Sequence, residues 1–130
     1  RRFVCRTDPW PAAMRESMAG LGRDCYLSLW GPSEFHPTGS LRDFDVTDRL
    51  GEIAVPTLFT VGRYDEATPE SVASFRARVP GAGLVVLERS AHMTMLDEPE
   101  AYRAALRPFL RSVDRGEPGR PTGASPGARP

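Results

Sequence analysis

The sequence predicts an α/β fold, and within that class the closing section of a larger parallel sheet. Two short apolar runs rich in β-branched residues, 55–61 and 84–87, are typical of strands buried on both faces. Each run is followed by a segment with helix-start residues and an apolar stripe. The resulting order of strand, helix, strand, helix is the layout of parallel βαβ units. Because two strands alone leave both edges of such a sheet without neighbours, we expect the rest of the sheet upstream of Arg1.

The residues before the first strand have weak periodicity. A helix is predicted over 12–21, and its apolar stripe consists of residues spaced four and three apart, Met14, Met18 and Leu21. Clusters of Pro and Gly at 31–33 and 36–39 then predict a loop. A short turn is expected at 47–50, directly before the first strand.

The helix between the two strands has a clear start signal. Thr68 supplies a hydroxyl cap, Pro69 occupies the first helical position, and Glu70 adds an acid to the first turn. Its predicted buried stripe is Val72, Phe75 and Val79. We expect the helix to end at Pro80.

A second loop and a final helix follow the second strand. The loop is predicted over 88–96, and the helix opens at 97–100. Its predicted buried stripe is Tyr102, Ala105, Leu106, Phe109 and Leu110. Pro108 removes a backbone hydrogen bond and crowds the preceding turn, so we expect a kink or a loosened last turn there.

Composition excludes several classes of function. The 130 residues carry 17 basic and 17 acidic side chains, so no net charge recruits nucleic acid or an acidic membrane. No window approaches the roughly 18 apolar residues of a membrane helix, and we expect no secretion leader and a cytoplasmic protein. Cys5 and Cys25 are too few for a disulfide framework or a zinc site, and we expect neither a metal nor a cofactor.

An acid and a histidine follow successive strands. Asp65 lies in the loop after the first strand and His92 in the loop after the second. Ligands of open α/β sheets gather at the carboxyl ends of strands. Nucleophile, acid and then histidine is also the chain order of α/β-hydrolases. An imidazole can act as the base for a hydroxyl nucleophile, and a carboxylate on its other nitrogen holds the productive tautomer. Taken singly, Asp65 also suits a turn or capping residue and His92 an ordinary loop histidine.

Four segments together carry a more specific resemblance. They resemble the C-terminal part of the prolyl aminopeptidases (proline iminopeptidases), serine peptidases of the α/β-hydrolase fold, over roughly residues 20–112. The segments are 30–35 (WGPSEF), 45–50 (DVTDRL), 62–69 (GRYDEATP) and 90–93 (SAHM). The resemblance implies that Asp65 is the acid of the catalytic triad and His92 the general base.

The resemblance also implies a substrate site and a division into domains. Glu34 and Glu66 match the carboxylates that hold the free amino group of a substrate with N-terminal proline. Tyr26 either lines the same pocket or, as we expect, makes an apolar contact in the cap. We expect residues 1–44 to be the end of a helical cap, 45–112 the last part of the hydrolase core, and 113–130 a disordered tail rich in Gly and Pro.

The nucleophile of such an enzyme is expected elsewhere. We expect no nucleophile elbow (Gly-x-Ser-x-Gly) and no oxyanion-hole loop in this chain, but place both upstream of Arg1, in the missing N-terminal half of the hydrolase. Cys25 precedes Asp65 and His92 in the right order but lacks a strand-to-helix turn, and His36 receives no role. The chain alone is therefore expected to be inactive.

Two other interpretations stay open. Another α/β-hydrolase, such as an epoxide hydrolase or an esterase, would share Asp65 and His92 but would have no use for Glu34. Alternatively, the chain is a truncated, non-catalytic fragment that retains half of a site.

Overall fold

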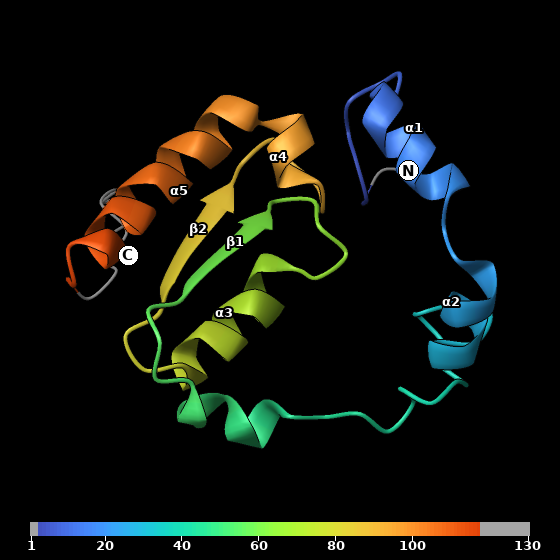
Figure 1. Ribbon diagram of the computed structural model, residues 1–130, viewed down its shortest axis with the longest axis horizontal. Coiled ribbons are helices and arrows are strands. Elements are labelled where there is room, and N and C mark those ends of the chain that lie inside the picture. The colour runs from blue at the N-terminus through green and yellow to red at the C-terminus, as the bar shows by residue number, and fades with distance from the viewer. Residues whose placement is uncertain (1–2, 118–130) are drawn as a thin grey trace, which may run out of the picture. The chain divides into compact units, whose positions relative to one another are not determined.

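The core of the molecule is a pair of parallel strands flanked by helices. A computed structural model describes residues 3–117 of the chain. Within these residues the sheet consists of β1 (Leu58–Gly62) and β2 (Gly83–Leu87), which pair in parallel over their full length (Figure 1). The predicted parallel α/β layout is confirmed. Because the strands run in register, both end at the same edge and deliver their following loops there.

The burial of the strands is incomplete in this part of the chain. Val61 and Gly62 are buried at the end of β1, whereas the first three residues of the strand are half-buried. In β2 the first and last residues are buried and the middle three are half-buried. The prediction of strands buried on both faces is therefore wrong for residues 58–60 of β1 and residues 84–86 of β2. The physical reason is that each strand has one hydrogen-bonded neighbour among the described residues, whereas full burial needs neighbours on both edges.

The helix between the strands, α3 (Pro69–Arg78), begins as its sequence predicts. The hydroxyl of Thr68 accepts a hydrogen bond from the backbone N–H of Ser71 at 3.3 Å, and Pro69 is the first helical residue. After the helix, Val79 is buried, while Phe75 of the predicted stripe is 36% exposed. The helix packs against both strands. Local capping thus determines where this helix starts, and its contact with the sheet determines which of its side chains are buried.

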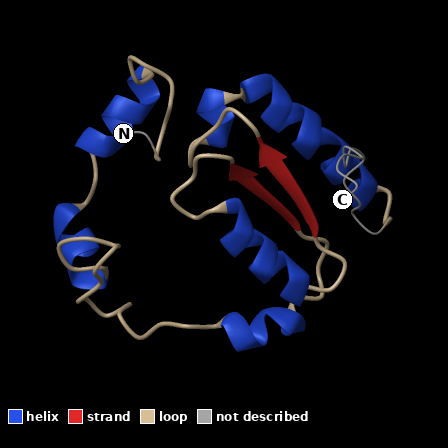
Figure 2. Ribbon diagram, turned by 180° about the vertical axis from the view of Figure 1, so that it is seen from behind, coloured by secondary structure: helices blue, strands red, loops and turns tan. Residues whose placement is uncertain are grey.

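Two helices follow β2. A short helix, α4 (Thr94–Asp97), precedes the long helix α5 (Pro99–Asp114). The sheet lies between α3 and α5, as the opposite views of Figures 1 and 2 show. The sequence predicted loop at 88–96, so α4 was missed. Its four residues are too short to show an apolar period.

The last helix continues past its internal proline. α5 runs through Pro108 to Asp114, so its last turn does not loosen at Pro108, and residues 113–114 are helical, not part of a tail. Phe109 and Ser112 are buried on the turn that follows the proline. Burial of this turn opposes the cost of the hydrogen bond that Pro108 removes. Residues 115–117 follow the helix, and the last part of the predicted tail, 118–130, lies outside the described residues.

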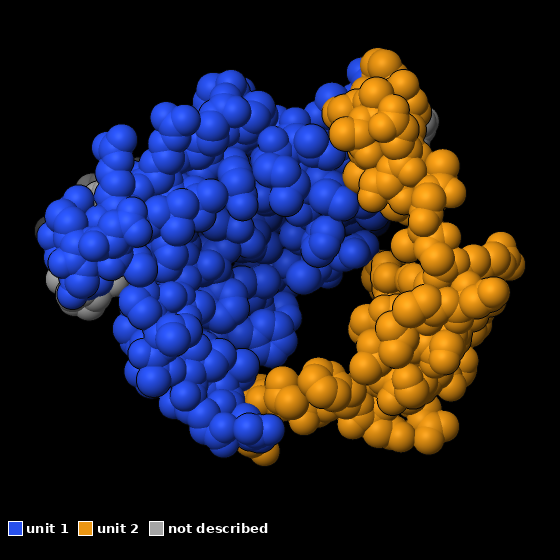
Figure 3. Space-filling model, viewed as in Figure 1, with its two compact units in different colours: residues 1–8, 49–130 blue, residues 9–48 orange. Residues whose placement is uncertain are grey.

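The chain divides into two compact units, coloured separately in Figure 3. The larger unit consists of Arg1–Asp8 and Arg49–Pro130, and the smaller one of Pro9–Asp48. Residues 3–8 therefore group with the sheet, whereas the sequence assigned 1–44 to the cap. No helix within residues 3–117 has both the length and the apolar composition needed to cross a membrane.

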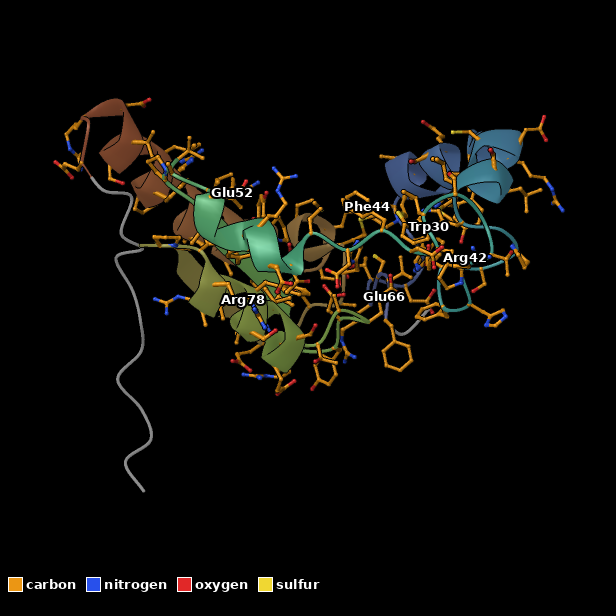
Figure 4. All side chains as sticks on the ribbon, turned by 90° about the horizontal axis from the view of Figure 1, so that it is seen from below. Trp30, Arg42, Phe44, Glu52, Glu66 and Arg78 are labelled. Atoms are coloured by element: carbon orange, nitrogen blue, oxygen red, sulfur yellow. The ribbon has the colours of Figure 1, made fainter. Side chains whose placement is uncertain are left out.

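The smaller unit contains α1 (Ala12–Ala19) and α2 (Arg23–Leu29), and the 3-10 turn η1 (Thr47–Glu52) spans the boundary. The loop after α2 folds back along the helix end. The carbonyl of Trp30 (labelled in Figure 4) accepts hydrogen bonds from the N–H groups of Thr38 and Gly39. A Cβ on Gly39 would collide with the backbone of Ser28 and Leu29, so glycine is required for this close approach.

Candidate active site

The loops after β1 and β2 are joined by their backbones. The N–H of Arg63 donates to the carbonyl of Leu87 at 2.8 Å, and the N–H of Tyr64 donates to the carbonyl of Ser90 at 3.0 Å. Gly62 makes this approach possible, because a Cβ there would collide with the carbonyl oxygens of Ser90 and Ala91. The carboxyl end of the sheet therefore brings the two loops into direct contact.

These loops bring Asp65 and His92 together. The Nδ1 of His92 lies 3.1 Å from the Oδ1 of Asp65. The Asp65 side chain is 6% exposed and that of His92 is 50% exposed. Asp65 Oδ1 also accepts a hydrogen bond from the N–H of Ala67 at 2.9 Å, which fixes the carboxylate in an Asx turn. A buried, fixed carboxylate therefore faces one nitrogen of an accessible imidazole.

This geometry selects a tautomer. A carboxylate accepts hydrogen bonds, so it favours the imidazole form with the proton on Nδ1. The Nε2 of His92 then carries the free lone pair and can accept a proton from another group. The arrangement can act as a general base whose positive charge, once formed, is stabilised by Asp65.

Two acidic residues that the sequence assigned only to a helix start hold the histidine loop. Oε2 of Glu98 accepts hydrogen bonds from the N–H of Arg89 at 2.8 Å and the hydroxyl of Ser90 at 2.7 Å. Oδ2 of Asp97 accepts one from the N–H of Ala91 at 2.9 Å. Each residue from 89 to 91 thus donates to one of these carboxylates, directly before His92.

These donors lower the pKa of both carboxylates. Burial by itself raises the pKa of Asp97, but hydrogen bonds from Ala91, Thr7 and Cys5 outweigh it and hold the pKa below its ordinary value. Burial likewise raises the pKa of Glu98, and the hydrogen bonds from Ser90 and Arg89 lower it overall. Sequence reasoning missed this role because the donors lie outside any local helix-start pattern.

The two predicted substrate carboxylates occupy different units. Glu66 follows Asp65 in the loop between β1 and α3 and is half-buried (Figure 4). Glu34 belongs to the smaller unit and is exposed. Its Oε2 accepts a hydrogen bond from the Tyr26 hydroxyl at 3.2 Å, and its N–H donates to the same hydroxyl at 3.3 Å. Tyr26 therefore makes a polar contact with Glu34, where the sequence led us to expect an apolar one.

The remaining candidates both lie in the smaller unit. Cys25 lies exposed on α2 in the smaller unit, and His36 is exposed in the loop that follows. Among residues 3–117, no group of three or more His, Cys, Asp or Glu side chains is placed to hold a metal ion.

The expectation that the chain contains no Gly-x-Ser-x-Gly pattern is wrong. Residues 123–127 read Gly-Ala-Ser-Pro-Gly and so match Gly-x-Ser-x-Gly, although they lie outside the described residues. This match follows His92, whereas the nucleophile of an α/β-hydrolase precedes both the acid and the histidine. We therefore give Ser125 no role.

Eight curated relatives of the chain are named proline iminopeptidase. No protein-family model matches. The proline iminopeptidase of Heyndrickxia coagulans is 41% identical over 114 residues, which are 87% of this chain and 40% of that protein. Further relatives with the same name are 32–39% identical over 80–87% of the chain. The chain thus spans about two fifths of the length of the relatives it matches.

Solved structures agree with this result. A crystal structure of a proline iminopeptidase from Mycobacterium smegmatis superposes with a TM-score of 0.82 at 36% identity, covering 89% of this chain and 40% of that one. The crystal structure of VinJ superposes with a TM-score of 0.78 at 41% identity, covering 86% and 38%. The described strands and helices therefore have the arrangement found in part of each of these larger proteins.

Proposed function

We propose that this chain belongs to a serine aminopeptidase that releases proline from the amino terminus of peptides. The chain corresponds to the C-terminal part of the proline iminopeptidases and has the fold of the last section of an α/β-hydrolase. The observation that carries this proposal is the contact between Asp65 and His92 at 3.1 Å. It is the acid-base half of a catalytic triad, on loops that follow two neighbouring parallel strands.

In the proposed reaction, Nε2 of His92 accepts the proton of a serine hydroxyl as that oxygen attacks the carbonyl carbon of the N-terminal residue. Asp65 stabilises the imidazolium that forms. His92 then returns the proton to the departing amine of the shortened peptide. A water molecule, activated by the same imidazole, hydrolyses the acyl-enzyme and releases proline.

We place the serine and the oxyanion hole in a part of the protein that precedes this chain. In the fold of these relatives the nucleophile comes before the acid and the histidine in sequence, and the chain spans two fifths of their length. It follows that the chain alone does not catalyse the reaction.

We further propose that Glu34 and Glu66 bind the amino group of the substrate. An α-amine has a pKa of about 8 and is mostly cationic at neutral pH. Charge-assisted hydrogen bonds to two carboxylates would fix this end of the peptide and favour substrates with a free amino terminus. The hydrogen bonds between Tyr26 and Glu34 support this role, because they hold the Glu34 carboxylate in one position.

Two cysteines in 130 residues are too few for a disulfide framework, and on this ground we propose that the protein acts in the cytoplasm.

The test is to express the complete protein and to follow release of the arylamine from a proline arylamide. We expect His92→Ala and Asp65→Asn each to lower kcat by about 10,000-fold or more, since both remove the acid-base function. His36→Ala, a change of the other histidine of this chain, should leave kcat within about twofold. Wild-type activity that survives in His92→Ala would refute the proposed mechanism.

A further inference from the structure

A short N-terminal segment contacts both loops that carry the proposed acid and base. We call residues 3–7 the strap. The carbonyl of Phe3 accepts a hydrogen bond from the N–H of His92 at 3.1 Å, and that of Val4 accepts one from the N–H of Met93 at 2.8 Å. The strap also contacts the loop after β1. The guanidinium carbon of Arg6 lies 3.9 Å from the centre of the ring of Tyr64, the residue that directly precedes Asp65. The strap therefore bridges the loops after β1 and β2.

The carboxylate of Asp97 joins the strap to the histidine loop. Its Oδ1 accepts hydrogen bonds from the N–H of Arg6 at 2.8 Å, from the N–H of Thr7 at 2.9 Å and from the Thr7 hydroxyl at 3.0 Å. The Cys5 thiol also lies 3.3 Å from this oxygen. Its other oxygen, Oδ2, accepts from the N–H of Ala91. One side chain thus accepts hydrogen bonds from donors about 85 positions apart in the chain.

The hydrogen bonds of Asp97 to the strap and to Ala91, which we call the clamp, lie next to the proposed base His92. Ala91 immediately precedes His92, and the N–H of His92 itself is bound by the strap. Half of the His92 side chain is exposed, so its own packing does little to hold the imidazole against Asp65. A displacement of about 1 Å at a reacting group can cost about 100-fold in rate.

We infer that Asp97 is a positioning residue: by clamping the strap to Ala91 it holds His92 in line with Asp65. This inference rests on the proposed function for its effect on rate. Asp97 need not touch the substrate, because its carboxylate oxygens are occupied by backbone and side-chain donors of the protein.

The substitution Asp97→Asn tests the clamp selectively. An amide keeps one acceptor oxygen, which can still serve the strap, but replaces the other with an N–H₂ donor that would face the N–H of Ala91. In the complete protein we expect kcat for a proline arylamide to fall about 10- to 100-fold, with KM changed by less than about threefold. Asp114→Asn, which removes the same charge from the exposed end of α5, should change neither constant.

A second measurement reports on the histidine itself. In ¹⁵N NMR spectra, the His92 signal is identified by its absence in His92→Gln. In the wild type we expect a slowly exchanging Nδ1 proton, because this proton is hydrogen-bonded to Asp65. In Asp97→Asn the exchange should be at least about tenfold faster, while the signals of His36 stay in place.

The outcomes separate this inference from the proposed function. An unchanged exchange rate together with an unchanged kcat in a folded Asp97→Asn protein overturns the inference. Faster Nδ1 exchange in a protein without peptidase activity supports the clamp and contradicts the peptidase.

If Asp97→Asn does not fold, Thr7→Val replaces it, because this change removes one strap donor at nearly constant volume. We then expect a two- to fivefold fall in kcat with KM unchanged. Unchanged kinetics in Thr7→Val would in that case overturn the inference.

Discussion

At the scale of single residues, the carboxylate of Asp65 decides which nitrogen of His92 is available for chemistry. It is buried, fixed by the N–H of Ala67, and 3.1 Å from Nδ1. The Glu34 carboxylate is held differently: Glu34 is exposed on a loop, and its carboxylate accepts a hydrogen bond from the hydroxyl of Tyr26 in α2. The first arrangement suits proton transfer, for which position matters most. The second suits recognition of a charged group by an accessible acid.

A substitution at Glu34 distinguishes a proline aminopeptidase from another α/β-hydrolase. Glu34→Gln keeps the shape of the side chain but removes its charge. A hydrogen bond to a charged group contributes on the order of 1.5–3 kcal/mol. We therefore expect KM for a proline arylamide to rise about 10- to 100-fold, with little change for a neutral ester.

The control for this experiment is Asp43→Asn, which removes an exposed carboxylate from the same unit, where it pairs with Arg42. This control should leave KM unchanged for both the arylamide and the neutral ester. Equal kinetics of Glu34→Gln and wild type on the arylamide would instead favour an esterase or epoxide hydrolase.

At the scale of elements, the junction of α4 and α5 holds the loop that follows β2. Asp97 ends α4 and Glu98 precedes the first residue of α5, and both accept hydrogen bonds from residues 89–91. The loop after β1 is held separately by its backbone contacts to Leu87 and Ser90. The helix junction therefore supports the loop that carries His92 and also forms the start of α5.

The hydrogen bonds to Asp97 and Glu98 predict that the folded protein loses stability in acid. The pKa of Asp97 and that of Glu98 are lowered in the folded protein, so both carboxylates bind protons more readily after unfolding. Their contribution to the free energy of unfolding is complete above the unfolded pKa values of about 4 and is lost as the pH falls through the lower folded values.

Urea unfolding of the complete protein between pH 7 and pH 2 measures this effect. Glu98→Gln should be less stable than wild type at pH 7, and the difference should shrink as the pH falls below about 4. Glu100→Gln, on the exposed side of α5, should stay within about 0.5 kcal/mol of wild type at pH 7. A difference between Glu98→Gln and wild type that is independent of pH would contradict this account.

At the scale of the whole molecule, much apolar surface is exposed in the described part of the chain. Phe3, Phe35, Phe44 and Val55 are each more than half exposed. Each strand has a single hydrogen-bonded neighbour within residues 3–117. These features agree with the finding that the chain spans two fifths of its relatives, in which further strands and helices would cover such surfaces.

The 130-residue chain produced by itself should therefore behave as an incomplete domain. We expect no turnover of a proline arylamide, strong binding of the dye ANS, and a broad urea transition in place of a cooperative one. The complete protein, measured in parallel, should bind little dye and unfold cooperatively. A purified chain that cleaves the arylamide would contradict both the missing nucleophile and the proposed mechanism.

Local sequence determined the order of β1, α3, β2 and α5 and the placement of Asp65 and His92 on neighbouring loops. The start of α3 follows from Thr68 and Pro69, whose cap and fixed φ act within one turn. Asp65 and His92 could be found because each directly follows an apolar strand, and parallel strands bring their ends together. Only the tertiary structure decided that α5 continues through Pro108 and that Asp97 clamps residues 5–7 to Ala91. The reason is that burial and hydrogen bonds between distant segments depend on packing, which leaves no period or spacing in the sequence.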